Sequence, residues 1–367
     1  MSDSYRIDSH KLIYHPKIVG EILDAEGDWE KAKKIAPIYA EISPVGACNH
    51  RCTFCAVDYI GYQSRTLDFD VFSARIKEMG GMGLKSVMFA GEGEPLLHKK
   101  IVEMCEYTHM AGIDIAFTSN ATVIPKGFNE RVLPITSWFK ASVNAGTEDS
   151  YSIIHQTKSS DFNRVIENLS SMIEYRNSHN LSSVIGAQIL LLPENSHEIT
   201  TLARICKERI GLDYLVVKPY SQHLFSHTTK YNGLSYDGLL ELEEKLNFFN
   251  SDTFQVIFRS ETMKKYSELE ESRYKKCSAT PHLWMYVMAD GSLYSCSAFL
   301  LDDRFKLGNI MTQSFKEIWQ GEKRKQNMSF VENTLDIGEC RRNCRMDAAN
   351  RYLSELKSNS VPHVNFI

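Results

Sequence analysis

The chain has 367 residues, with 42 basic and 46 acidic side chains and a formal net charge of −4. This length favours one large domain with a smaller one, and the mildly acidic balance argues against nucleic acid as a partner. The chain has no N-terminal signal pattern and no uncharged apolar run long enough to span a membrane, so we expect a cytoplasmic protein. In that reducing compartment its nine cysteines are expected to be metal ligands, catalytic thiols or buried apolar residues.

Short apolar and β-branched runs alternate with longer amphipathic patterns from Pro37 to about residue 224. Six of these runs predict strands: 38–43, 86–90, 113–118, 137–143, 182–192 and 214–219. The segments between them carry apolar residues at three-to-four spacing and end in Gly or Asn, as helices do. Strands alternating with helices predict an α/β fold with parallel pairing, either a partial (β/α)6 TIM-like barrel or a doubly wound sheet.

The pattern becomes polar and charged after about residue 224. Beyond it, 284–300 predicts two strands around an Asp-Gly turn, and 314–326 predicts a helix. We therefore expect five parts: an N-terminal extension at 1–37, the barrel at 38–224, a linker or helical segment at 225–270, a small α+β domain at 271–350 and a C-terminal tail at 351–367.

Three cysteines, Cys48, Cys52 and Cys55, follow the first predicted strand within ACNHRCTFCAVDY. Such closely spaced thiolates are soft ligands suited to an iron–sulfur cluster or to zinc. Zinc needs a fourth ligand, and the nearby candidates are His50 and Asp58. On a cluster of four irons, three thiolates leave one iron open, and that iron can bind the amino and carboxylate groups of S-adenosylmethionine (SAM).

This loop resembles the signature of the radical SAM superfamily, C-x3-C-x2-C with an aromatic residue before the third cysteine. Phe54 has that position, and the resemblance implies that its ring lies along the adenine of SAM. The resemblance also implies a partial barrel, and an enzyme that cleaves SAM reductively to a 5′-deoxyadenosyl radical.

A second motif, AGEGEPLLH after the second predicted strand, resembles the superfamily's Gly-Gly-Glu-Pro-type turn, whose backbone meets the amino group of the cofactor. Gly93, Glu94 and Pro95 match the pattern. The chain departs from it at Glu92, where Gly is more usual, with Gly91 one step earlier. Taken alone, the same run is typical of an ordinary polar turn.

Two further segments resemble the ends of the superfamily's third and fourth strands. FTSNAT and ASVNAGTEDSY imply that Ser119 and Ser142 contact the cofactor, with Asn144 as an alternative. The second segment also predicts a turn followed by a helix cap at Thr147.

Four cysteines, Cys277, Cys296, Cys340 and Cys344, lie in the C-terminal quarter. Together with the LGNI and SFKEIW segments they resemble the shortened SPASM domain, often called a twitch domain. The resemblance implies one auxiliary [4Fe–4S] cluster with four protein ligands. The alternative is a zinc ribbon, because four cysteines around a hairpin also bind zinc.

The other two cysteines, Cys105 and Cys206, lie in helical patterns and are predicted to be buried apolar residues. One of them would otherwise be a hydrogen-atom donor to a substrate radical. We leave both out of the site because helices outside a barrel seldom reach its mouth.

Polar residues on the fifth and sixth predicted strands are candidates to face the substrate. We select Gln188, Lys218 and Tyr220 as catalytic candidates. Burial disfavours the charge of a lysine and would allow it to take a proton. The alternative is that these residues belong to solvent-exposed loops.

The expected function is that of a radical SAM enzyme, of oxidoreductase or epimerase type, which removes a hydrogen atom from a small polar substrate such as a sugar or aminocyclitol. The resemblance implies SAM, two [4Fe–4S] clusters and an external electron donor such as flavodoxin or ferredoxin. The alternatives are a peptide-modifying maturase and a non-catalytic iron–sulfur or zinc-binding protein. A carrier needs no vacant iron, so the three-cysteine loop argues against the last of these.

Overall fold

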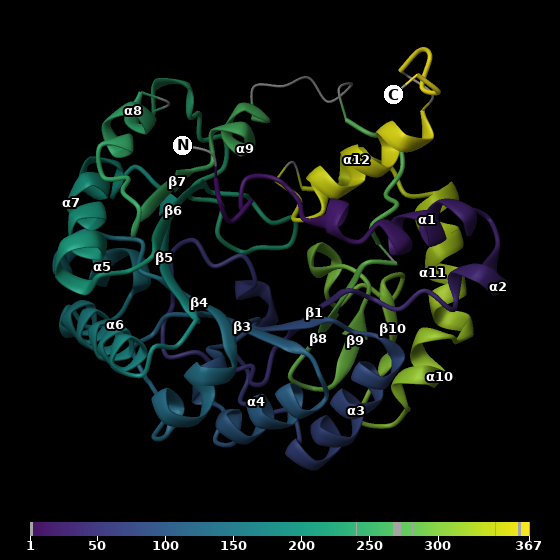
Figure 1. Cartoon of the computed structure of the whole chain (residues 1–367), viewed down its shortest axis with the longest axis horizontal. Coiled ribbons are helices and arrows are strands. Elements are labelled where there is room, and N and C mark those ends of the chain that lie inside the picture. The colour runs from purple at the N-terminus through teal and green to yellow at the C-terminus, as the bar shows by residue number, and fades with distance from the viewer. Residues whose placement is uncertain are drawn as a thin grey trace.

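The computed structural model describes residues 3–239, 241–266, 273–280, 282–341, 343–358 and 361–366. Its centre is one curved sheet of ten strands in the order β10-β9-β8-β1-β2-β3-β4-β5-β6-β7. Figure 1 shows this sheet as an open arc with helices along its outer side. Strands β1 to β6 stand in chain order without a reversal, which is the arrangement of a partial barrel, whereas a doubly wound sheet reverses direction at a switch point.

The six predicted strands are all present and pair in parallel. They are β1 (Tyr39–Ile42), β2 (Ser86–Phe89), β3 (Asp114–Ser119), β4 (Thr136–Ser142), β5 (Val184–Leu191) and β6 (Tyr214–Pro219). A seventh parallel strand, β7 (Gln255–Phe258), extends the sheet beyond β6. It lies in the segment expected to be a linker or helical, so the expectation of six strands was one short.

The C-terminal strands continue the barrel sheet at its other edge. β8 (Trp284–Val287) pairs in parallel with β1, and β9 (Ser292–Tyr294) and β10 (Lys306–Asn309) follow in antiparallel order. The predicted hairpin is therefore present, but it shares one sheet with the barrel. The boundaries of the five predicted parts stay predictions.

Helices cover the convex side of the sheet and the C-terminal region (Figure 1). Those along the barrel are α3 (Phe69–Met82), α4 (Ile101–Met110), α5 (Glu148–His155), α6 (Ser160–Ser178), α7 (Ile199–Arg204), α8 (Leu242–Asn247) and α9 (Ser260–Lys264). Those of the two terminal regions are α1 (Pro16–Asp24), α2 (Trp29–Ala32), α10 (Phe315–Trp319), α11 (Glu322–Asn333) and α12 (Asp347–Lys357). The predicted cap is confirmed, because the Thr147 hydroxyl accepts a hydrogen bond from Ser150 N at the start of α5.

The two faces of the sheet differ in polarity. On β4, Phe139 and Ala141 are fully buried in the core beneath the helices, whereas Lys140 and Ser142 alternate with them and lie on the concave face. Strand β5 repeats this pattern, with Gln188 on the concave side. The concave face therefore carries the polar groups that can meet a ligand.

The N-terminal segment covers part of this concave face. Tyr5 and Ile7 pack against Tyr214, Val216 and Ile257 of β6 and β7. The chain then crosses to the C-terminal region, where residues of α1 and α2 share an apolar cluster with residues of α12 (Figure 1). The segment thereby narrows the open side of the arc.

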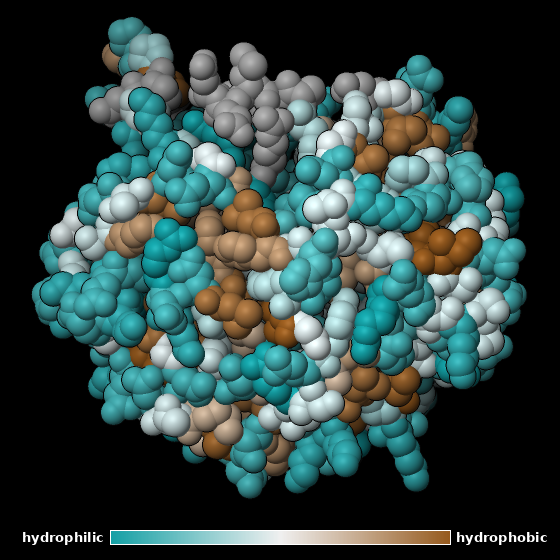
Figure 2. All heavy atoms as spheres, turned by 180° about the vertical axis from the view of Figure 1, so that it is seen from behind, coloured by the Kyte–Doolittle hydropathy of each residue, from teal (hydrophilic) through white to brown (hydrophobic). Residues whose placement is uncertain are grey.

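Figure 2 shows the reverse side of the molecule, where most side chains are hydrophilic and separate hydrophobic patches lie between them. Within the described ranges, no helix has the length and apolar character needed to cross a membrane.

Candidate functional site

The three-cysteine loop begins just after β1, at the edge of the sheet where the barrel strands end. It is held against the last turn of α5, because Arg51 N donates to the His155 carbonyl (3.1 Å) and Thr53 N to that of Ile154 (2.9 Å). The guanidinium of Arg51 also donates to the carbonyls of Cys48 and His50. The loop therefore has a defined path on which its three thiols can converge.

The three thiols are close enough to influence one another. Burial raises the pKa of Cys52, and the charges of Cys55 and Cys48 raise it further. Burial likewise raises the pKa of Cys48 to about 12, and the charge of Cys55 adds to this effect. Metal binding reverses such a preference because a coordinating thiol is deprotonated. This crowded set of sulfur donors fits an iron–sulfur cluster.

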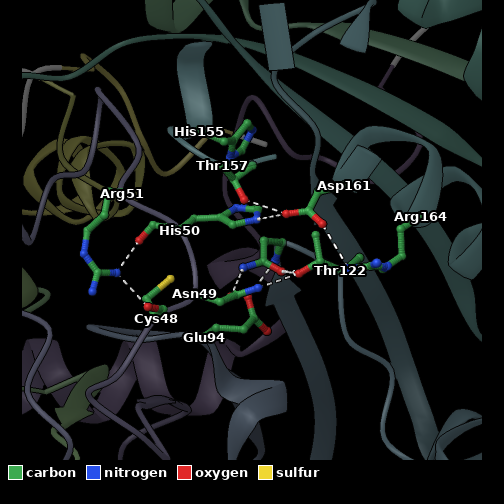
Figure 3. A network of polar contacts seen from close by, with 12 residues as sticks. Cys48, Asn49, His50, Arg51, Glu94, Thr122, His155, Thr157, Asp161 and Arg164 are labelled. Atoms are coloured by element: carbon green, nitrogen blue, oxygen red, sulfur yellow. Dashed lines mark hydrogen bonds and ion pairs between the residues drawn. The ribbon is translucent and has the colours of Figure 1, made fainter. Parts of the chain in front are cut away.

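Two histidines lie near the thiol of Cys52. His50 belongs to the loop itself, whereas His155 on α5 approaches it from outside and was not anticipated from the sequence. The Nδ1 atom of His155 is 3.2 Å from the sulfur of Cys52, while its Nε2 atom is 2.9 Å from the Val143 carbonyl oxygen. His50 is buried with its Nε2 atom 3.8 Å from a carboxylate oxygen of Asp161 (Figure 3). Burial lowers the pKa of His155 to about 3 and of His50 to about 4, so both rings are neutral at pH 7.

The zinc alternative requires His50 or Asp58 as a fourth ligand beside the three cysteines, and the structure places these two residues differently. Donor atoms of His50, Cys52 and His155 lie within 4.8 Å of one another. Asp58, the other candidate ligand, instead accepts hydrogen bonds from Ser226 Oγ and from the backbone N–H groups of 227 and 228, each at 2.9 Å. Asp58 therefore braces the segment after β6 against the cysteine loop.

The Gly-Glu-Pro turn after β2 packs directly on the same loop. A Cβ atom at Gly93 would stand 2.3 Å from the carbonyl oxygens of Ala47 and Val45, so only glycine fits there. Gly91 has φ +125°, and a Cβ atom there would collide with Ser43. These glycines let the turn approach the cysteine loop.

Glu94 ties the end of β2 to the end of β3. Its carboxylate accepts hydrogen bonds from Ser119 Oγ (2.7 Å), Asn120 N (2.7 Å) and Leu96 N (3.1 Å). The Ser119 hydroxyl also accepts from Ala121 N. The side chains of Glu94 and Ser119 are thus engaged with each other, and their predicted cofactor contacts stay predictions.

Glu92 points toward the C-terminal hairpin. Its Oε1 accepts a hydrogen bond from Ala289 N (2.6 Å), and its other carboxylate oxygen lies 3.8 Å from Arg65. Arg65 in turn contacts Asp290 at 3.3 Å. Glu92, which replaces the usual glycine of the turn pattern, therefore links the turn to the C-terminal region. The cysteine and turn spacing did not reveal this role.

A polar network joins the cysteine loop to β3 (Figure 3). Asn49 Nδ2 donates to Thr122 Oγ1, and Asn120 Nδ2 donates to Asn49 Oδ1, both at 2.7 Å.

Phe54 lies edge-on to His155 with ring centroids 5.6 Å apart. The predicted adenine contact of Phe54 stays a prediction.

The predicted substrate-facing residues lie in two environments. Lys218 on β6 and Gln188 on β5 occupy the concave face, where Gln188 Nε2 donates at 2.7 Å to the Oγ atom of Ser142 on β4. The predicted cofactor contact of Ser142 stays a prediction. Tyr220 is buried against Tyr231, and its hydroxyl donates to Gln222. Burial raises the pKa of Tyr220 to about 12, so it is protonated at neutral pH.

The four C-terminal cysteines come together from separate segments. Burial raises the pKa of Cys296, and the charges of Cys344, Cys277 and Cys340 raise it further. Burial also raises the pKa of Cys344 to about 11. Asn350 Nδ2 donates to the Cys277 sulfur at 3.3 Å. Four neighbouring thiols fit an auxiliary iron–sulfur cluster with full protein ligation.

The two cysteines left out of the site are fully buried. Cys105 on α4 and Cys206 after α7 both belong to the apolar core. Their prediction as buried apolar residues is confirmed.

Comparisons with known proteins agree with this arrangement. Residues 42–206 match the radical SAM superfamily, and residues 277–345 match SPASM, an iron–sulfur cluster-binding domain. The chain is 22% identical over 306 residues to the tungsten-containing aldehyde ferredoxin oxidoreductase cofactor-modifying protein of Pyrococcus furiosus, covering 78% of this chain and 81% of the relative. It is 25% identical to GTP 3′,8-cyclase of Chlorobaculum tepidum over 198 residues, covering 53% and 58%.

Solved structures share the fold. SuiB of Streptococcus suis bound to SAM has a TM-score of 0.64 at 18% identity, covering 82% of this chain and 70% of that one. The protein anSMEcpe with bound AdoMet has a TM-score of 0.57 at 18% identity, covering 88% and 95%.

The fold and the match over residues 42–206 identify a radical SAM domain. More particularly, the chain combines this domain with a C-terminal SPASM iron–sulfur domain at residues 277–345, an arrangement that matches a radical SAM enzyme with an auxiliary-cluster domain. Its cofactors are SAM, the [4Fe–4S] cluster of the radical SAM domain and the iron–sulfur cluster that the SPASM domain binds.

Proposed function

We propose that this enzyme removes a hydrogen atom from a small polar substrate held on the concave face of the barrel, leading to oxidation or epimerisation. A reduced cluster held by the three-cysteine loop, recharged by an external electron donor, would give one electron to bound SAM, which would break the sulfur–C5′ bond to yield methionine and the 5′-deoxyadenosyl radical that removes the hydrogen atom. We assign the SAM-binding cluster to Cys48, Cys52 and Cys55, and the auxiliary cluster to the four C-terminal cysteines.

The polar concave face supports this proposal best. Lys218, Gln188 and Ser142 lie on it, and the side chains of Tyr5 and Ile7 narrow its open side. A face with few, spaced polar groups suits a compact polar molecule. In an oxidation the substrate radical would give one electron to the auxiliary cluster and one proton to a base in the barrel.

A peptide substrate is the second candidate. SuiB, whose fold this chain shares, has been solved with its precursor peptide SuiA, and anSMEcpe has been solved with the Cp18Cys peptide. The shared fold makes a peptide worth testing in the same experiment.

The test is 5′-deoxyadenosine formation by the anaerobically reconstituted, chemically reduced enzyme. Low-mass and peptide fractions of a cell extract are compared with the substrate-free background. We expect stimulation by the low-mass fraction. Stimulation by the peptide fraction alone would replace the small substrate with a peptide. No cleavage of SAM by protein that holds both clusters would contradict the proposed chemistry itself.

A further inference from the structure

Two lysines lie on the concave face, of which only Lys218 was among the predicted site residues. Lys140 on β4 pairs in register with Gly186 of β5, and Lys218 on β6 pairs with Leu190 of the same strand. Gln188 lies midway between those two partners. The three side chains therefore occupy one diagonal across adjacent strands.

Neither lysine ammonium has a hydrogen-bond or ion-pair partner in the described part of the chain. The Lys140 ammonium lies 5.2 Å from the centre of the Trp138 ring. Glu41, the acidic side chain that acts on Lys140, is already paired with Arg345. The two half-buried lysines thus have no acidic partner among the described residues.

The surrounding cations are already engaged. Arg259 pairs with Asp8 at 3.1 Å, and Arg341 donates to the Ser221 carbonyl at 3.1 Å. Arg259 and Arg341 still contribute positive electrostatic potential at Lys218. Burial lowers the pKa of Lys218 well below its usual value, and the charges of Lys140, Arg259, Arg345 and Arg341 lower it further.

An unmatched charge in such a place lowers stability, and an anionic ligand would offset that cost. Within the described ranges, the buried amide oxygen of Gln188 also has no hydrogen-bond partner, although its Nε2 donates to Ser142. The amide oxygen of Gln188 could accept a hydrogen bond from a ligand hydroxyl or amino group, and the two lysines could bind an anionic group of the same ligand.

We infer that the substrate carries a carboxylate or phosphoryl group, which Lys140 and Lys218 bind together, while Gln188 Oε1 accepts a hydrogen bond from a neighbouring hydroxyl or amino group. This inference rests on the proposed function, because it names the substrate class of the same barrel face. It gives Lys218 a binding role in place of the proton-acceptor role predicted from the sequence.

The experiment measures anion binding calorimetrically to the unreduced holoenzyme saturated with SAM, so no turnover is needed. Inorganic phosphate and acetate are titrated separately to distinguish the two anion types. We expect at least one to bind, and Lys140→Met or Lys218→Met to weaken it by about tenfold or more, the range of a lost charge-assisted hydrogen bond. Lys218→Arg should retain binding because it keeps the charge.

The matched control is Lys77→Met, since Lys77 is exposed on α3. It should bind the anion as the unmodified enzyme does. Iron content and circular dichroism of each variant establish that the protein is folded and loaded. Absence of binding by both probes, equal binding by the lysine variants, or displacement of SAM by the probe would each overturn the inference.

A pH series separates binding from proton transfer. Burial, with the charges of Arg345 and Arg259, lowers the pKa of Lys140 to about 8, while Glu41 opposes the shift and Lys218 is the other lysine on this face. Anion binding needs charged lysines, so affinity should fall as pH rises through the lowered pKa values of Lys140 and Lys218. Affinity that rises with pH would contradict the inference.

This experiment can fail independently of the proposed function. If the enzyme cleaves SAM with an extract fraction but binds neither anion, only the substrate class is wrong. If it binds an anion but never cleaves SAM, the site stands and the proposed chemistry fails.

Discussion

The cysteines near residue 50 and those near the C-terminus are held by different kinds of structure. Cys48, Cys52 and Cys55 lie on one loop that rests on α5 through backbone hydrogen bonds. The C-terminal set joins Cys277, which precedes β8, with Cys296 after β9 and with Cys340 and Cys344 after α11. The first set offers three donors and the second offers four. Under the proposed assignment, a four-iron cluster on the first set would keep one iron open, whereas a cluster on the second set would be fully held by protein ligands.

The largest effect is expected from Cys52→Ala. Loss of one of only three ligands should abolish SAM cleavage and remove about four irons per chain, the content of one [4Fe–4S] cluster. Iron analysis and 5′-deoxyadenosine formation measure these changes. If all iron were lost, the two sites would not be independent.

The complementary change is Cys296→Ala in the C-terminal set. It should also remove about four irons while leaving the SAM-binding signal of the first cluster in its electron paramagnetic resonance spectrum. The apolar cluster that includes Tyr286, Phe299 and Phe305 packs against Cys296, so unfolding should shift to lower temperature. Loss of the SAM-dependent signal would contradict the separation of the sites.

Chelation distinguishes an open cluster from a saturated one without mutation. An iron chelator should remove iron in two phases, the faster one from the three-cysteine site, because that cluster has an iron without a protein ligand. Saturating SAM should slow only the faster phase. Absorbance of the released iron complex follows both phases, and equal protection of both would count against the assignment.

The contact between the two regions is tested by Glu92→Ala. The substitution leaves the buried Ala289 N–H without its acceptor, so we expect a loss of about 1–3 kcal/mol in unfolding free energy. Glu92→Gln retains an acceptor oxygen and serves as the control. Urea denaturation measures both variants, and equal stability would show that the contact contributes nothing.

The smallest effect is expected at a cysteine that belongs to neither site. Cys105→Ala removes one buried sulfur atom from the core, which should lower stability by about 1 kcal/mol. Iron content and SAM cleavage should not change. A loss of iron would mean that Cys105 takes part in a site after all.

Much of the barrel was predictable because its signals are local. The six strands are short apolar runs, and Thr147 caps α5 as its position before acidic residues suggested. Strand β7 was missed because its four residues are embedded in a polar stretch, where periodicity is hard to recognise. The pairing of β8 with β1 was missed because it joins segments more than two hundred residues apart.

In the site, too, local sequence patterns were predictable, whereas contacts between distant segments were not. Spacing predicted the thiols, but no spacing connects Cys52 with His155, which meets it from α5. Glu92 was recognised as a departure from a pattern, yet its contact with Ala289 is visible only in the structure.

The sequence alone predicted the class of chemistry, through the resemblance of its three-cysteine loop to the radical SAM signature, because three thiols within one short loop constrain the metal group locally. It also determined the alternation of strands and helices, since each element carries its own periodicity. Only the tertiary structure decided which charges share the barrel face. Lys140 and Lys218 stand on different strands, and parallel pairing through β5 brings them together. Their missing counter-charge is a property of the packed sheet, because charge balance depends on neighbours in space.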